Sequence, residues 1–349
     1  MSLGARMAAC TIDGERHSVE HVYATDLDPN ACATYARNIH GGESDCVEHG
    51  DIRDKDLATL PDFDGMAFGF PCNDFSIVGE TRGIEGKYGP LYTYCVDAVR
   101  IKNPKWFVAE NVSGLQGANG GDAFEAILKA FGGAGEGYEL TTHLYKFEDY
   151  GVPQKRHRIL IVGIRKDLDL KFQVPAPTTP TSDQQVTAMQ ALSGISADAA
   201  NHDRTNQAPQ VVARLKEIPE GKNAWWEDLP KEHQLNVKGA RLSSIYRRLD
   251  RNKPAYTVTG SGGGGTHMYH WEEPRALTNR ERARLQTFPD DYVFEGVREK
   301  VRRQIGMAVP PAGAKVVFRA LLKTLAGQTY ASVPPKWGGV LSERQLTLL

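Results

Sequence analysis

Short apolar runs that end in polar residues mark the expected strands of this chain. One run is Gly65 to Phe70, a second is Trp106 to Ala109, and His21 to Asp26 is a third. An amphipathic segment around Leu91 to Ile101 predicts a helix between the first two. Asp28 follows the third run and is expected to cap a helix. This alternation of strands and helices predicts an α/β protein.

The run ending at Phe70 breaks into Pro71 and Cys72, followed by polar, turn-prone residues. Open α/β sheets bind their ligands at the carboxyl ends of their strands, so a thiol there can be a nucleophile. A buried structural cysteine is the alternative. The second run delivers Glu110 to the same edge, where a carboxyl suggests acid or hydrogen-bond-donor chemistry. The alternative for Glu110 is a surface residue at a strand end.

Two aspartates have positions typical of a nucleotide site. Asp26 ends its predicted strand, where an acidic residue can bind ribose hydroxyls, and Asp51 could end a further strand and face an adenine. Taken alone, such aspartates are more often turn or cap residues.

A basic pattern begins after Tyr150-Gly-Val-Pro153. Gln154, Arg156 and Arg158 are spaced two apart as a strand begins, which predicts that they share one face. Such a face suits phosphate or base contacts, and a solvated edge is the alternative.

Composition narrows the class of protein. The chain has 349 residues, 40% hydrophobic and 24% charged, which is ordinary globular usage. No run of eighteen apolar residues and no signal-peptide pattern occur, so a non-secreted, cytoplasmic protein is expected. The five cysteines show no zinc or disulfide pattern. Since the net charge is −1, nucleic-acid binding would need local basic surface.

Several motifs in one order carry a family resemblance. They are Asp26-Leu-Asp-Pro29, Gly50-Asp-Ile52, Pro71-Cys72, Glu110-Asn-Val112, Gln154-x-Arg-x-Arg158, Arg248 with Pro254 to Thr259, Arg275 to Glu281 with Leu285 to Pro289, and Gln304 to Pro310. Together, over about residues 2 to 325, the chain resembles the DNA (cytosine-5) methyltransferases. The resemblance implies a Rossmann-like S-adenosylmethionine-dependent methyltransferase domain and a smaller target-recognition domain.

The resemblance also implies a mechanism. Cys72 would add to C6 of a flipped-out cytosine, Glu110 would stabilise the ring at N3 and the exocyclic amine, and Arg158 would hold the O2 edge with Arg156 as its neighbour. The methyl donor would be S-adenosyl-L-methionine, and no metal is expected.

The same resemblance assigns cofactor contacts to the first third of the chain. Asp26 would hold the ribose, Leu27 would pack on the adenine, Asp51 and Ile52 would meet its edge, and Pro71 would lie near the sulfonium. The family's opening Phe-x-Gly-x-Gly-Gly motif is absent, which suggests a misplaced start or a truncated gene. Met307 stands where the family usually carries Asn.

The expected organisation is a catalytic domain over residues 1–174, a small domain over 175–275, a return to the catalytic domain over 276–327, and a tail over 328–349. Gln154 and Arg248 are the expected DNA contacts. The expected partner is double-stranded DNA, with a cognate restriction endonuclease acting separately on a monomeric methyltransferase.

Three other functions are compatible with parts of this pattern. An RNA cytosine-5 methyltransferase would share Cys72 and Glu110, although the sizeable variable region favours DNA. A truncated chain could bind DNA without methylating it. An unrelated thiol enzyme would need a catalytic histidine, and no motif here suggests one.

Overall fold

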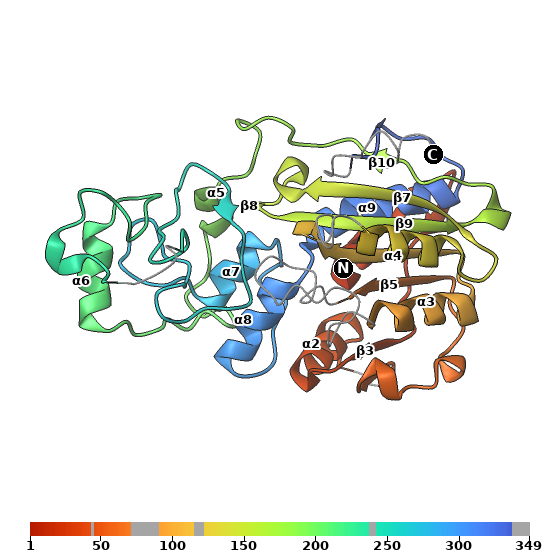
Figure 1. Ribbon diagram of the computed structural model, residues 1–349, viewed down its shortest axis with the longest axis horizontal. Helices are drawn as coiled ribbons and strands as arrows, with labels where there is room; N and C mark the ends of the chain where they lie inside the picture. The colour runs from red at the N-terminus through yellow and green to blue at the C-terminus, as the bar shows by residue number, and fades with distance from the viewer. Residues whose placement is uncertain (43–44, 71–90, 115–121, 237–241, 337–349) are drawn as a thin grey trace.

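The computed structural model describes residues 1–42, 45–70, 91–114, 122–236 and 242–336. The described chain forms a larger lobe built on a sheet and a smaller, loop-rich lobe beside it (Figure 1). Pro71 and Cys72 lie outside the described residues.

The central sheet has the strand order β5-β6-β9-β7. Its strands are β5 (Gly65–Gly69), β6 (Trp106–Val112), β7 (Tyr138–Lys146) and β9 (His157–Arg165). The β5 and β6 strands are parallel, and α3 (Leu91–Lys102) lies between them in the sequence, whereas β9 runs antiparallel to both β6 and β7. This mixed sheet confirms the α/β prediction.

Alternating residues of β6 supply two separate cores. Trp106 and Val108 belong to an apolar cluster with α1 (Ser2–Met7) and α9 (Pro311–Leu325). Phe107 and Ala109 belong to another, with α3 and α4 (Asp122–Gly132). Since neighbouring strand residues point to opposite faces, helices cover both faces of the sheet.

The first helix packs directly on the last long one. A Cβ atom added at Gly4 would lie 2.4 Å from the Cβ of Ala314, so the two backbones meet where neither has a bulky side chain. The hairpin of β1 (Cys10–Ile12) and β2 (Glu15–His17) follows. Its turn residues Asp13 and Gly14 both have positive φ, the conformation that an Asp-Gly hairpin turn favours.

A second, two-stranded parallel sheet pairs β3 (Ala24–Asp26) with β4 (Val47–His49). Between them runs α2 (Pro29–Ile39), whose N-cap is the predicted Asp28. Asp28 also pairs with Lys300 at 2.9 Å. These contacts together lower the pKa of Asp28 to about 2, with the hydrogen bond from Asn30 as the largest cause.

The smaller lobe contains α5 (Ala188–Leu192), α6 (Pro209–Glu217), α7 (Asn279–Leu285) and α8 (Arg298–Met307). A short parallel pair, β8 (Gln154–Lys155) with β11 (Ala255–Tyr256), lies where the lobes meet (Figure 1). The α7 and α8 helices share one apolar cluster with Leu249 and Val258. Residues on both sides of the expected domain boundary at 275 therefore pack in one apolar cluster of the smaller lobe. In contrast, α9 packs on the large sheet.

The chain then returns to the larger lobe, where β12 (Ser332–Val333) pairs antiparallel with β10 (Val174–Pro175). The segment from Arg298 to Leu325 is long and apolar enough to cross a membrane, but 67% of its most apolar stretch is buried inside the protein. Because α8 and α9 line two cores here, this segment carries no membrane assignment.

Candidate active site

The ends of β5 and β6 meet as the sequence predicted. Gly69 pairs with Glu110 in the parallel register, and the buried Asn111 donates a hydrogen bond from Nδ2 to the carbonyl of Phe70 at 3.2 Å. A Cβ atom at Gly69 would lie only 3.0 Å from Oε2 of Glu110. The chain therefore leaves β5 beside Glu110, two residues before Cys72.

Glu110 and Arg158 form an ion pair at this edge. Oε1 of Glu110 lies 2.8 Å from Nε of Arg158, and each side chain is only 15% exposed. Because β9 runs antiparallel to β6, its first residues reach the edge where β6 ends. The two charges neutralise each other in a partly dry position, as a buried carboxylate requires.

The neighbouring Arg156 is buried and makes structural contacts. It donates hydrogen bonds to the carbonyls of Val258 at 3.0 Å and Gly306 at 2.8 Å. Burial lowers its pKa to about 9, and the positive charge of Arg158 acts in the same direction. Arg156 thus joins the end of the large sheet to the smaller lobe.

Gln154 is also fully buried. Its Nε2 donates to the carbonyl of Leu285 and to Oε1 of Gln286, and its Oε1 accepts from the amide of Val258. The unpaired basic face expected from the spacing of Gln154, Arg156 and Arg158 is therefore not formed, because all three side chains have protein partners. DNA contact by Gln154 stays a prediction that its buried position does not favour.

Arg248 is buried as well. Its guanidinium donates to the carbonyls of His270, Trp271, Leu215 and Ile218. Burial lowers its pKa. DNA contact by Arg248 likewise stays a prediction, since the side chain is turned into the smaller lobe.

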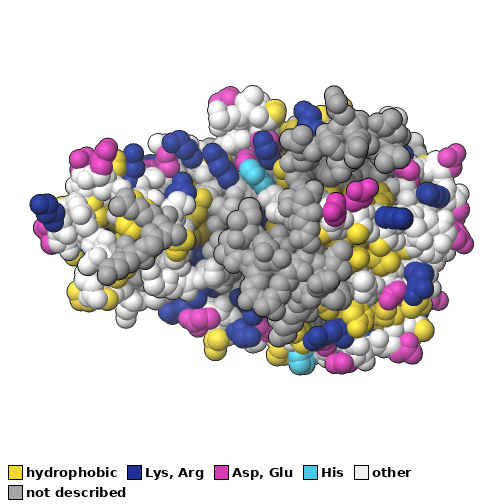
Figure 2. All heavy atoms as spheres, in the orientation of Figure 1, with side chains coloured by type: hydrophobic (Ala, Val, Ile, Leu, Met, Phe, Trp, Pro, Cys, Tyr) yellow, Lys and Arg dark blue, Asp and Glu magenta, His cyan; other side chains and the backbone are white. Residues whose placement is uncertain are grey.

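Basic residues that follow Arg248 in the sequence also have partners. Arg251 pairs with Glu220, and Lys253 pairs with Asp250. On the face shown in Figure 2, Lys and Arg side chains are interspersed with Asp and Glu.

The expected cofactor residues lie at the ends of β3 and β4. Asp26 pairs in register with His49, and the Gly50 amide donates to the Asp26 carbonyl, which continues the ladder toward Asp51. Asp51 caps the short 3₁₀ helix Ile52–Asp54. Leu27 is 66% exposed.

The Asp51 carboxylate is engaged by Arg53. The backbone amide and the guanidinium of that residue both donate to it, and these hydrogen bonds lower the pKa of Asp51 to about 2. The Asp51 carboxylate therefore stays charged near neutral pH and can accept further hydrogen bonds.

The thiols of Cys95 and Cys32 have raised pKa values, unlike a reactive cysteine, whose pKa is lowered. Burial raises the pKa of Cys95 to about 12, and it also raises that of Cys32. Both thiols stay protonated near neutral pH and are poor nucleophiles. Within the described ranges, no group of three or more His, Cys, Asp or Glu side chains could hold a metal ion.

Two residues of the site were not assigned a role from the sequence. Gly69 is needed because a side chain there would strike Glu110. Gln286, buried between α7 and α8, donates to the carbonyl of Ile305 and accepts from Gln154. The glycine before Phe-Pro-Cys and the Leu-Gln-x-Phe-Pro motif were the available signals.

Comparison with known proteins places the chain in a family. The C-5 cytosine-specific DNA methylase family matches residues 1–323. The Type II methyltransferase M.BbvI of Brevibacillus brevis is 56% identical over 329 residues, covering 93% of this chain and 87% of that protein. The Type II methyltransferase M.NgoFVII of Neisseria gonorrhoeae is 42% identical, covering 92% and 83%.

A crystal structure from Escherichia coli, described as that of a prophage-encoded DNA modification methyltransferase, matches with a TM-score of 0.70 at 21% identity. The match covers 93% of this chain and 96% of the other and shows a shared fold. The family match extends over nearly the whole chain. The chain therefore belongs to the C-5 cytosine-specific DNA methylase family, which confirms the prediction of a DNA (cytosine-5) methyltransferase with an α/β fold.

Proposed function

We propose that this protein methylates C5 of a flipped-out cytosine in a specific duplex DNA sequence through a covalent bond between Cys72 and C6. The observation that carries the proposal is the Glu110–Arg158 pair, held at the strand edge where the chain leaves β5 for Cys72.

Cys72 would supply the nucleophile. Cytosine C5 is a weak nucleophile, and addition of a thiolate to C6 breaks the C5–C6 double bond and moves electron density toward C5 and N3. Methylation of C5 is followed by loss of the C5 proton and elimination of the sulfur from C6. The thiolate and the aromatic ring are then restored, so the residue is unchanged over one cycle.

Glu110 and Arg158 would bind the polar edge of the base. A protonated Glu110 can donate to N3 while its other oxygen accepts from the exocyclic amine, and Arg158 can donate to O2. Both act where negative charge develops after thiol addition. Their existing contact means that the two groups are already close together before the base arrives.

The strand ends of the small parallel sheet fit an adenosine group. Asp26 and Asp51 offer carboxylates for ribose hydroxyls and an exocyclic amine, and the exposed Leu27 offers an apolar surface for a flat ring. Ile52 and Pro71 complete the proposed set. S-adenosyl-L-methionine supplies the methyl group when it is bound there.

The substrate is proposed to be double-stranded DNA. Flipping a base out of the stack costs a few kcal/mol, which contacts in the pocket and to the backbone must offset. The enzyme would protect sites from a separately acting restriction endonuclease, as a monomer in the cytoplasm; the names of its relatives as Type II methyltransferases support the restriction-modification role.

Covalent trapping tests this mechanism. The protein is mixed with duplex DNA of random sequence containing 5-fluorocytosine, with and without S-adenosyl-L-methionine, and denaturation-resistant adducts are measured. Fluorine cannot leave as a cation, so elimination is blocked after methylation. We expect an adduct that requires the cofactor and is lost in Cys72→Ala.

Cys95→Ala is the matched control, because Cys95 is half-buried and its thiol has a raised pKa. It should keep the adduct. Absence of an adduct with wild-type protein that still binds the duplex would contradict the proposed chemistry and favour a protein that binds DNA without methylating it. Preferential adduct formation with transfer RNA containing 5-fluorocytosine would favour the RNA alternative.

A further inference from the structure

A small pocket lies where α7 and α8 meet the glycine-rich loop before His267. Three of its lining side chains are arginines, Arg282 from α7 and Arg298 and Arg302 from α8. None of the three belongs to the contacts that hold the Glu110 site together.

Arg282 forms the buried wall of this pocket. Arg282 is only 1% exposed. Its Nη1 and Nη2 atoms are both buried without a hydrogen-bond partner. Burial lowers its pKa to about 10, and the charge of Arg302 acts in the same direction. The guanidinium stays charged at neutral pH. A buried cation with unpaired donors is costly, so these two nitrogens need an acceptor.

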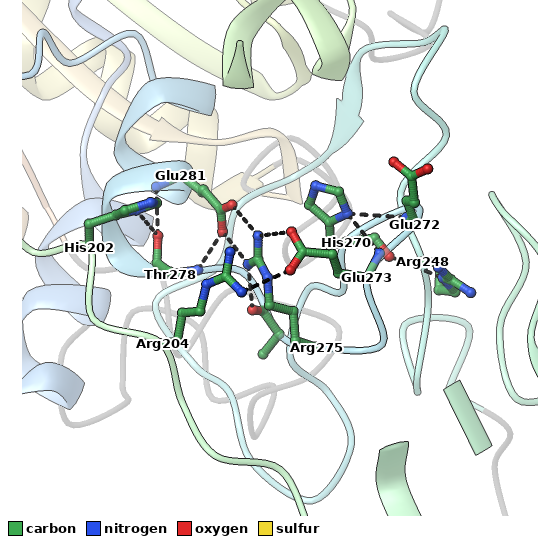
Figure 3. A network of polar contacts seen from close by, with 10 residues as sticks. His202, Arg204, Arg248, His270, Glu272, Glu273, Arg275, Thr278 and Glu281 are labelled. Atoms are coloured by element: carbon green, nitrogen blue, oxygen red, sulfur yellow. Dashed lines mark hydrogen bonds and ion pairs between the residues drawn. The ribbon is translucent and has the colours of Figure 1, made fainter. Parts of the chain in front are cut away.

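The nearby carboxylates are already used (Figure 3). Glu281 accepts from Arg275 at 2.7 Å and from the amide of Thr278. Glu273 is shared between Arg275 and Arg204. This network closes the turn before α7. The charge of Glu281 raises the pKa of Arg282, but among the described residues neither glutamate accepts a hydrogen bond from its guanidinium.

The other lining groups become more exposed toward the mouth. Arg302 is half-buried, with its Nε buried and unpaired, and its Nη2 donates to the carbonyl of Gly262. Arg298 is exposed and donates to Thr205 at 3.3 Å. The three guanidiniums therefore form a path from solvent to the buried Arg282.

Three further titratable groups, His267, Glu299 and Asp203, lie on or near this path. The pKa of His267 is lowered to about 4, first by burial and then by Arg282 and Arg302, so the ring is neutral at pH 7. Glu299 acts on His267 in the opposite direction. Asp203 lines the pocket, and among the described residues no ion pair joins it to an arginine. The lining keeps an excess of positive charge.

The free space in the pocket is about 10 Å³, which suits one oxygen atom or one water molecule. We propose that the pocket binds a phosphate of the DNA backbone, with one non-bridging oxygen against Arg282 and Arg302 and the rest of the phosphate at Arg298. This inference rests on the proposed action on duplex DNA and adds a positioning contact to it.

A phosphate of the DNA backbone fits this pocket better than a free anion that is enclosed completely within it. The interior takes one oxygen only, and the exposed Arg298 continues the positive charge outward. At Gly263 of the adjoining loop, an added Cβ would meet nothing within 4 Å, so a polymer can approach without striking side chains there. Arginine also matches phosphate geometry through paired donors.

The test compares full-length wild-type protein with Arg282→Met and Arg302→Gln. Arg319→Gln on α9 removes an exposed charge elsewhere and is the control. Fluorescence anisotropy gives the dissociation constant for a labelled duplex at several KCl concentrations between about 50 and 200 mM, a range in which phosphate contacts have large effects.

For Arg282→Met we expect binding weakened about tenfold and a plot of log K against log[salt] that is shallower by about 1, the contribution of one lost phosphate contact. Arg302→Gln should move both values in the same direction. Arg319→Gln should leave the slope unchanged.

Thermal unfolding in sodium sulfate and in sodium chloride of equal ionic strength separates the sources of the anion. If sulfate raises the melting temperature of wild type but not of Arg282→Met, while the DNA salt slopes are equal, the site takes free anions only and the proposal is wrong. If neither measurement distinguishes folded Arg282→Met from wild type, the pocket holds only water and the proposal is equally wrong.

Failure of the wild-type protein to bind any duplex would overturn the proposed function along with this inference. In contrast, wild-type methylation of DNA with an unchanged salt slope in both variants would overturn the phosphate site alone. If Arg282→Met does not fold, Arg302→Gln decides, because its half-buried side chain can be replaced with less disturbance.

Discussion

Arg156→Met tests whether this arginine holds the lobes together or takes part in chemistry. The side chain donates to the carbonyls of Val258 and Gly306, residues more than a hundred positions away in the sequence. Methionine has a similar length and no donor, so the variant removes both hydrogen bonds with little change in volume.

The expected cost follows from the two carbonyls left unpaired. Each buried acceptor without a partner costs about 1–3 kcal/mol. Relief of the burial of a guanidinium whose Nε has no hydrogen-bond partner offsets part of this. We therefore expect the free energy of unfolding to fall by about 2–4 kcal/mol, mainly through weaker attachment of the smaller lobe.

Urea unfolding followed by tryptophan fluorescence measures this loss, and methyl transfer is measured in parallel at low temperature, where the variant is folded. Arg158→Met is the matched control on the same strand. It should abolish methyl transfer at a smaller cost in stability, because it removes one ion pair at the strand edge and no hydrogen bond between the lobes.

The opposite pattern would refute this reasoning. If Arg156→Met unfolds at the wild-type urea concentration but loses methyl transfer, the residue takes part in the chemistry. If both variants behave alike in both assays, the division between a structural and a site arginine is wrong.

Three further predictions concern the site, the pH dependence and the packing. Gly69→Ala should lower methyl transfer about 10- to 100-fold with an unchanged melting temperature, because its Cβ would displace the Glu110 carboxylate; wild-type activity would contradict this. Burial lowers the pKa values of His21 and His143 to about 4 in the folded protein, whereas an exposed histidine has a pKa of about 6.5. Between these two pH values the unfolded chain therefore binds more protons than the folded protein. The free energy of unfolding should therefore fall between pH 6.5 and 4, by about 1–2 kcal/mol per histidine after screening, and His143→Gln should show a shallower dependence in urea titrations; an equal slope would exclude His143 as a contributor. Gly4→Val should cost about 1–3 kcal/mol or more in calorimetry, because the new side chain meets α9 at van der Waals overlap, and an unchanged melting temperature would show that α1 can move away.

Local sequence determined the helices and strands that carry the catalytic edge. The unbroken apolar run from Trp106 to Ala109 predicts a strand buried on both faces, and its residues divide between two apolar clusters. Thr278 and Glu281 form a capping box at the start of α7, a Thr-x-x-Glu pattern whose groups all lie within one helical turn. The β1–β2 hairpin also has a local sequence signal, the Asp13-Gly14 dipeptide at its turn.

The meeting of β5 and β6 followed from sequence for a similar reason. A helix between two strands leads to a parallel pair, and parallel strands end at one edge. Glu110 could therefore be assigned to the end of β5 without knowledge of the remaining strands. Where Asp26 and Asp51 lie was predictable in the same way, from two strands joined by a helix.

Only the tertiary structure decided which polar side chains face inward. The spacing of Gln154, Arg156 and Arg158 describes directions along one strand, but their partners come from residues far along the chain. Arg248 was an expected DNA contact, yet its guanidinium donates to four backbone carbonyls. Arg282 carried no motif signal, and its unpaired nitrogens follow from burial between two helices. Hydrogen bonds within a turn or a strand depend on neighbours in sequence, whereas burial and the pairing of charges depend on which distant segments pack together, and this is a property of the folded chain alone.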